Sequence, residues 1–141
     1  MTEDELKRRT KTFALRILKL VAALPRTVAA WTIGSQLARS GTSVPANYRA
    51  ACRARSKAEF ISRLGVVEEE ADESALWLEL IIEGELMKKT LVERLWVEAD
   101  EIVAIMTSSR KSAAKSLLSE TARRHSRVSP NVSIKNQKSK V

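Results

Sequence analysis

The sequence predicts an all-α fold in which four helices pack as a bundle. Three observations support this prediction. The 141 residues include only four glycines and three prolines, too few for the regular turns of an all-β fold. Apolar residues recur at spacings of three and four in four successive stretches, as on one side of a helix. Helix-capping or helix-breaking residues separate these stretches, so each one has a predicted beginning and end.

The stretch 56–83 is predicted to be the central helix. Ser56 and Glu59 have the spacing of a capping box, in which the serine hydroxyl and the glutamate side chain bind backbone N–H groups at the helix start. Between residues 75 and 82 the chain is apolar on nearly every side, which predicts neighbours all around the helix. The main apolar stripe comprises Phe60, Leu64, Val67, Ala71, Ser74 or Ala75, Leu78 and Ile82.

Two helices are predicted before this central one, over residues 3–24 and 28–55. Pro25 ends the first helix and Thr27 caps the second. Pro45 predicts a bend in the second helix, and Gly41 predicts a close approach of another helix. The seam of the first helix is Leu6, Phe13, Ile17, Leu20 and Leu24.

A fourth helix is predicted to begin at a second capping box, Thr90 and Glu93, after a C-cap at Gly84. It is expected to fray through 117–118, with disorder beyond Arg123. Its predicted seam is Leu91, Leu95, Ala99, Ile102 and Met106, with a second stripe of Val92, Trp96 and Val103. The predicted domains are a bundle over 1–109 and a basic, largely disordered tail over 110–141.

The net charge of +8 is concentrated in the predicted tail. Residues 110–141 hold nine basic residues and one acidic residue, whereas residues 1–109 are neutral. A mobile basic segment favours contact with phosphate backbones, and a solubilising tail is the alternative. The basic residues along the first helix form either a second site of contact with nucleic acid or a solvated surface. The candidate nucleic-acid-binding residues are Lys7, Arg8, Arg9, Lys11, Arg16, Lys19, Arg110, Lys111, Lys115, Arg123, Arg124 and Arg127.

Charge is also divided within the neutral part: residues 1–63 carry +9 and residues 64–109 carry −9. Either the two halves neutralise each other within one chain, or the basic side of one copy also meets the acidic side of the next. A head-to-tail contact of the second kind can close into a ring. The candidate residues for an interface between copies are Trp77, Ile81, Val92, Trp96 and Val103. The three tryptophans, Trp31, Trp77 and Trp96, are expected to be core or interface anchors.

Catalysis is not expected, because no histidine in residues 1–109 could activate Cys52 and no phosphate-binding or zinc-binding spacing occurs. The acids of the central helix could bind a divalent ion through oxygen ligands, but pairing with Arg49, Arg53 or Arg55 is the favoured interpretation, and no metal or cofactor is predicted. The single cysteine and the lack of a long uncharged run or secretory signal predict a cytoplasmic protein that does not span a membrane. Structural polar roles are predicted for Asn47, Arg49, Glu69, Asp72 and Glu73.

Residues 35–79 resemble the bacterial family first found as open reading frames in intervening sequences of large-subunit ribosomal RNA genes. The matching runs are SQLARSGTSVPAN at 35–47, EF at 59–60, EADES at 70–74 and WLE at 77–79. Many members continue with Ile-Ala-Glu-Gly after Asn47, whereas this chain has Tyr-Arg-Ala-Ala, so roles tied to that glutamate or glycine are not carried over. The resemblance covers residues 3–109. It implies an antiparallel up-and-down four-helix bundle that assembles as a ring, often a pentamer, without known catalytic activity.

Distant relatives of that family are accessory proteins of diversity-generating retroelements, which bind a reverse transcriptase and nucleic acid. The sequence is thus interpreted as a non-enzymatic homo-oligomer that binds RNA or DNA, with RNA favoured. The alternative is a protein-interaction scaffold, for example an accessory subunit of a reverse transcriptase.

Overall fold

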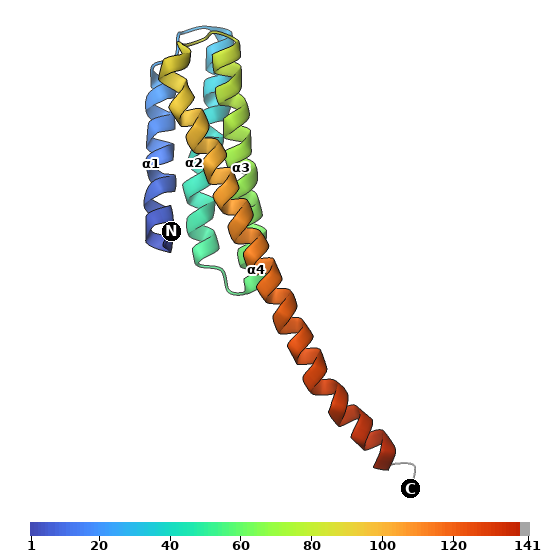
Figure 1. The fold of residues 1–141 in the computed structure, drawn as a ribbon. Helices are drawn as coiled ribbons and strands as arrows, with labels where there is room; N and C mark the ends of the chain where they lie inside the picture. The colour runs from blue at the N-terminus through green and yellow to red at the C-terminus, as the bar shows by residue number, and fades with distance from the viewer. Residues whose placement is uncertain (139–141) are drawn as a thin grey trace.

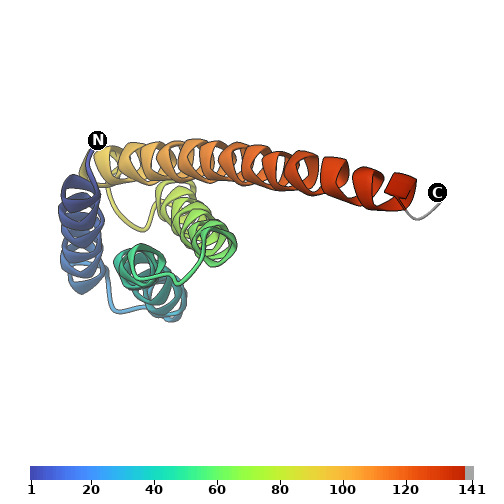
Figure 2. The ribbon, with the colours of Figure 1, turned by 90° about the horizontal axis from the view of Figure 1, so that it is seen from below.

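The computed structural model describes residues 1–138, and their side chains as far as Val128. Within this range the chain forms four helices: α1 (Glu3–Ala22), α2 (Val28–Cys52), α3 (Lys57–Glu83) and α4 (Lys89–Lys138). Successive helices run in opposite directions, which confirms the predicted antiparallel up-and-down bundle (Figure 1). The view from below shows that α3 lies between α2 and α4, whereas α1 packs mainly on α2 (Figure 2).

The starts of the first three helices follow from their caps. Thr2 and Glu5 form a full capping box at α1. The hydroxyl of Thr27 accepts from the Ala30 N–H at 3.2 Å at the start of α2. The Ser56 hydroxyl accepts from the Glu59 N–H at 3.1 Å, as predicted, but the Glu59 carboxylate binds the N–H of the preceding residue, Arg55.

The predicted capping box at Thr90 is wrong, because α4 already begins at Lys89. The chain turns into α4 through Gly84, the C-cap of α3, and Glu85, whose φ of 54° is left-handed. This start places Val92 in the core, while Leu91, predicted for the seam, is exposed.

The core runs the length of the bundle and follows the predicted seams closely. Its largest fully buried side chains include Phe13 and Ile17 of α1, Leu37 of α2, Leu64 of α3 and Ile102 of α4. Gly41 lies directly against Ile17, so the expected close approach at that glycine occurs between α1 and α2. The α2 helix passes through Pro45 without interruption.

The burial of side chains bears on two expectations. Ile81 and Val92, proposed for contact between copies, have no exposed surface in the single chain and belong to its own core. Leu76 and Leu80 are 47% and 37% exposed, so within one chain α3 has no neighbour on this side, and its cover by another copy stays a prediction. Trp77, Trp96 and Val103 are only half-buried, so they stay candidates for an interface.

The sequence predicts disorder beyond Arg123, whereas in the structure α4 continues as helix to Lys138. Among the side chains described, as far as Val128, Met106 is the last buried residue of α4, and the rest of the helix projects past the α2–α3 loop (Figure 1). Residues 107–128 contain neither glycine nor proline. Extending a helix that the bundle has already nucleated adds one hydrogen bond per residue, so no packing partner is required. The division into domains at residue 109 stays a prediction.

Candidate nucleic-acid interface

The cations of α1 do not form one continuous surface. Lys7, Arg8 and Lys11 line a groove between α1 and α2, which Arg49 joins from the α2 side. The Lys7 ammonium also lies 3.1 Å from the Glu3 carboxylate, but both side chains are exposed and such a pair contributes little. Of the α1 residues predicted to bind nucleic acid, Lys7, Arg8 and Lys11 lie together in this groove.

Arg9 faces α4 instead. Its guanidinium donates to both oxygens of Glu98, with Nε at 3.1 and 3.2 Å, and also to Glu101. Hydrogen bonding to Glu98 raises the pKa of Arg9. Because Arg9 is held between two carboxylates of its own chain, it is poorly placed to neutralise a phosphate.

The two remaining α1 candidates lie apart from this groove. Arg16 lines a second groove, between α1 and α4, together with Glu93, Glu98 and Glu101. Arg94 also lines this groove, so positive and negative charges are mixed there and no excess of positive charge is gathered. Lys19 is exposed in the last turn of α1.

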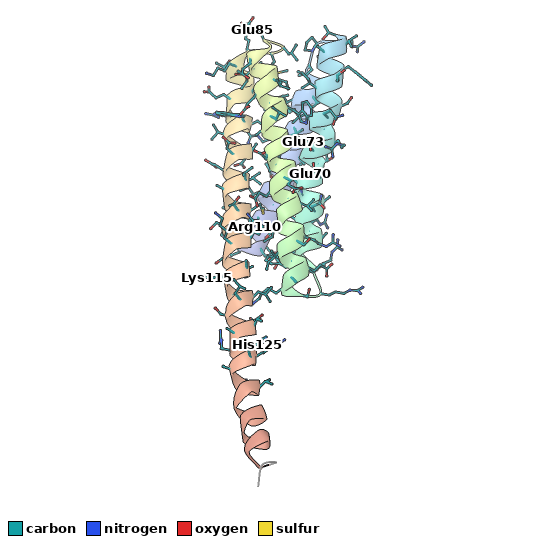
Figure 3. The ribbon with its side chains drawn as sticks, turned by 90° about the vertical axis from the view of Figure 1, so that its right-hand side faces the viewer. Glu70, Glu73, Glu85, Arg110, Lys115 and His125 are labelled. Atoms are coloured by element: carbon teal, nitrogen blue, oxygen red, sulfur yellow. The ribbon has the colours of Figure 1, made fainter. Side chains whose placement is uncertain are left out.

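Arg110 is likewise engaged within the chain. Its Nε donates to Glu68 of α3 at 2.8 Å, and the Thr107 hydroxyl donates to the other oxygen of that carboxylate at 2.7 Å. Both hydrogen bonds lower the pKa of Glu68, and the bond from Arg110 has the larger effect. Figure 3 shows Arg110 beside the bundle and Lys115 further along α4. Arg110 therefore fixes α4 on α3.

A second bridge fixes α4 where it leaves the bundle. The Lys57 ammonium, in the first turn of α3, donates to the Ser116 hydroxyl at 2.9 Å and to the Glu120 carboxylate at 2.6 Å. Lys57 lowers the pKa of Glu120, and the positive charges of Arg124 and Arg123 lower it further. The first turn of α3 thus lies beside the turn of α4 that holds Ser116 and Glu120.

Five exposed arginines lie within seven residues of Lys57 or Glu120 along the chain, and we call them the basic corner: Arg53, Arg55, Arg123, Arg124 and Arg127. Arg53 and Arg55 are exposed on the α2–α3 loop, and the other three are exposed on α4. The sequence pattern favours pairing of these two loop arginines with acids of α3. It did not identify them as residues that could bind an anion. The sequence does contain an indication of this site, because Arg53, Arg55 and Lys57 place three cations within five residues at the start of a helix.

The acids of α3 pair with other arginines than expected. Arg39 of α2 contacts Glu70 at 3.5 Å and also binds Glu73, which lies one turn further along α3 (Figure 3). The favoured partners Arg49, Arg53 and Arg55 have no ion pair among the described side chains. Asn47 donates to the Ser43 carbonyl at 2.8 Å, a local bond beside Pro45. Glu69 and Asp72 are exposed.

The described side chains contain no group of three or more His, Cys, Asp or Glu residues arranged to hold a metal ion. Cys52 is half-buried, and burial raises the pKa of its thiol, which disfavours the reactive thiolate. Over the same residues, no helix has the length and apolar character needed to cross a membrane.

A partly apolar surface runs along the outer side of α3. Leu76 and Leu80 lie one turn apart on this side, and Trp77 flanks Leu80 three residues before it. The Trp77 indole donates to Glu73 at 3.3 Å. Trp96 of α4 similarly donates to Glu79 at 3.1 Å. At the α1–α2 end of the bundle, Trp31 is 74% exposed beside a groove, so it is not a core residue.

Comparison with known proteins agrees with this architecture. The model of the 23S rRNA-intervening sequence protein family matches residues 3–108. A crystal structure of a protein of unknown function from the S23 ribosomal protein family of Bacteroides thetaiotaomicron has 34% sequence identity. It superimposes with a TM-score of 0.73 over 79% of this chain and 99% of its own. No curated protein matches the sequence. The chain therefore belongs to the 23S rRNA-intervening sequence protein family.

Proposed function

We propose that this protein is a non-enzymatic, cytoplasmic, homo-oligomeric protein that binds nucleic acid, with RNA as the target. The observation that carries the proposal is the set of exposed cations on α4 beyond its last buried residue, Met106. These are Lys111, Lys115, Arg123, Arg124 and Arg127.

These cations are suited to phosphate because they lack acidic partners. Among the described side chains none of the five takes part in an ion pair, whereas Arg9 and Arg110 do. Glu120, the single acid of residues 110–141, is already paired with Lys57. The projecting part of α4 therefore has an excess of positive charge that a polyanion can neutralise.

The test is a salt-titrated filter-binding assay on the full-length protein and on a variant with all five cations changed to glutamine. Each phosphate that the variant no longer neutralises should lower the slope of log K against log[salt] by about 0.7 for a single strand and about 0.9 for a duplex. We expect RNA binding by the native chain and a clear loss in the variant. Equal and negligible RNA binding by both proteins would refute the proposal.

Assembly of several copies is supported by two surfaces of opposite character. The groove with Lys7, Arg8, Lys11 and Arg49 is basic, whereas the outer side of α3 combines Leu76 and Leu80 with exposed acids such as Asp72. Contact between these surfaces is head-to-tail and closes into a ring, such as a pentamer, when the rotation permits. A monomer mass in light scattering at micromolar concentration would exclude this assembly.

The alternative function is an interaction scaffold, for example for a reverse transcriptase. It is favoured by the groove at the α1–α2 end, where Val28 is 84% exposed beside Trp31. Exposed tryptophans commonly act as binding anchors. A Trp31→Ser variant that binds a purified reverse transcriptase as well as the native chain does would remove this support.

A further inference from the structure

The basic corner has two walls, the α2–α3 loop and α4, and its three α4 arginines share one side of that helix. Arg123, Arg124 and Arg127 follow Glu120 by three, four and seven residues, so helical periodicity places them on the same side as Glu120. Glu120 binds Lys57, which belongs to the bundle. The three arginines therefore lie on the side of α4 that faces the end of the bundle, where Arg53 and Arg55 are exposed. Figure 1 shows α4 continuing past this loop.

We propose that the basic corner binds the backbone of a double-helical nucleic acid in preference to a single strand. The inference rests on the proposed nucleic-acid binding and specifies its substrate class. From Glu120 to Arg127, α4 rises by about 10 Å. Over that length a duplex presents about six phosphates and a single strand about three. The three arginines of α4 match the phosphates of one strand over this length, and Arg53 and Arg55 on the other wall are left for the second strand of a duplex.

The chemistry of the side chains supports the same substrate. Arginine binds phosphate through two parallel N–H donors, and all five members of the basic corner are arginines. Proteins that bind single strands without sequence preference stack the bases on aromatic side chains. Residues 110–128 contain no phenylalanine, tyrosine or tryptophan, and Phe60, which lines a groove with Arg55 and Lys57, is partly buried and packs against the core. His125 follows Glu120 by five residues and so projects from another side of α4.

The one acid beside these arginines does not oppose binding. Glu120 is compensated by Lys57 at 2.6 Å, and the same pair holds α4 against the first turn of α3. A fixed angle between the two walls favours a rigid partner such as a duplex. A flexible single strand would have to lose conformational freedom to contact both walls.

The experiment compares three full-length proteins by fluorescence anisotropy: the native chain, R123Q/R124Q/R127Q, and K88Q/K89Q/R94Q. The last variant loses the same charge from the opposite end of α4 and serves as the matched control. The probes are a labelled RNA duplex of about 16 base pairs and one of its strands, chosen to be unstructured. Circular dichroism of each variant checks that the helix content is unchanged.

We expect the native chain to bind the duplex about tenfold or more tightly than the strand at equal salt. The corner variant should lose most of this preference, and its salt slope should fall by about 2.7 because three phosphates are no longer neutralised. The control should keep the preference. A strand that binds as tightly as the duplex, or a control that loses as much as the corner variant, overturns the inference and leaves nucleic-acid binding intact. Absence of binding to either probe overturns both proposals.

Discussion

Two glycines in helix interiors offer a matched test of the packing. Gly41 lies at the closest approach of α1 and α2, where a Cβ added to the glycine would stand 2.8 Å from Cγ2 and 3.0 Å from Cγ1 of Ile17. Ile17 has no exposed surface, so it has little room to move. At Gly65 of α3 the nearest atom would be Arg110 Cδ, at 3.9 Å, which is ordinary contact with the stem of a long side chain.

Alanine at either position gains about 1 kcal/mol of helix propensity over glycine. Only Gly41→Ala also introduces overpacking, which costs typically about 1–3 kcal/mol in a well-packed core. We therefore expect Gly65→Ala to stabilise the bundle by about 1 kcal/mol and Gly41→Ala to destabilise it by about 1 kcal/mol. For a chain of this size the two midpoints of thermal unfolding should differ by about 6–8 °C.

The assay is urea and thermal unfolding followed by circular dichroism, at one protein concentration for all variants. A double-mutant cycle with Ile17→Ala identifies the cause, because the truncation removes the atoms that the new methyl group meets. The penalty of Gly41→Ala should then disappear, with a coupling of about 1 kcal/mol or more. The reasoning is refuted by a Gly41→Ala protein that is as stable as the Gly65→Ala protein.

Three further predictions concern the α3–α4 turn, the stability at low pH and the assembly. Glu85 has a left-handed φ of 54°, so Glu85→Gly should stabilise the protein by about 1 kcal/mol, measured by urea unfolding, and a loss of stability would contradict this. Because Arg110 and Thr107 lower the folded-state pKa of Glu68, their stabilisation is present above the unfolded pKa and is lost as pH falls through the folded value. Glu68→Gln should therefore flatten the acid side of the stability profile, and an unchanged slope would exclude this role. Leu76→Glu with Leu80→Glu should reduce the mass in light scattering to that of one chain at unchanged helix content, whereas an unchanged oligomer would exclude this side of α3 as the interface.

The features that the sequence predicts well are those that depend on a few neighbouring residues. Thr27 and Ser56 cap their helices because a hydroxyl needs only the next turn of backbone. The stripe through Leu64 and Leu78 is buried because any bundle hides the apolar side of a helix. At the start of α4, Leu91 is exposed and Val92 is buried. The two residues are adjacent and similar, so apolar periodicity alone does not determine which of them is buried.

Partners from different helices could not be predicted in this way. Arg8 and Arg9 are adjacent and chemically identical, yet only Arg9 lies at the α1–α4 contact, opposite Glu98. The arginine that meets Glu70 is Arg39, because α2 and α3 are antiparallel with an offset that the sequence does not specify. The helical course beyond Arg123 was not predicted for another reason. Absence of apolar periodicity indicates absence of packing, which does not prevent an existing helix from continuing.

The distribution of charge separates stability from the proposed binding. The cations at the α1–α4 and α3–α4 contacts, Arg9 and Arg110, are paired with acids across helices. The exposed arginines of α4, such as Arg123 and Arg127, lie beyond the last buried residue and have no packing role to lose. Neutralising them should lower nucleic-acid affinity while the melting temperature stays unchanged or rises slightly, because repulsion along the helix decreases. If instead the melting temperature falls with the affinity, the projecting part of α4 contributes to the stability of the bundle, and a loss of binding would no longer identify these arginines as the contact.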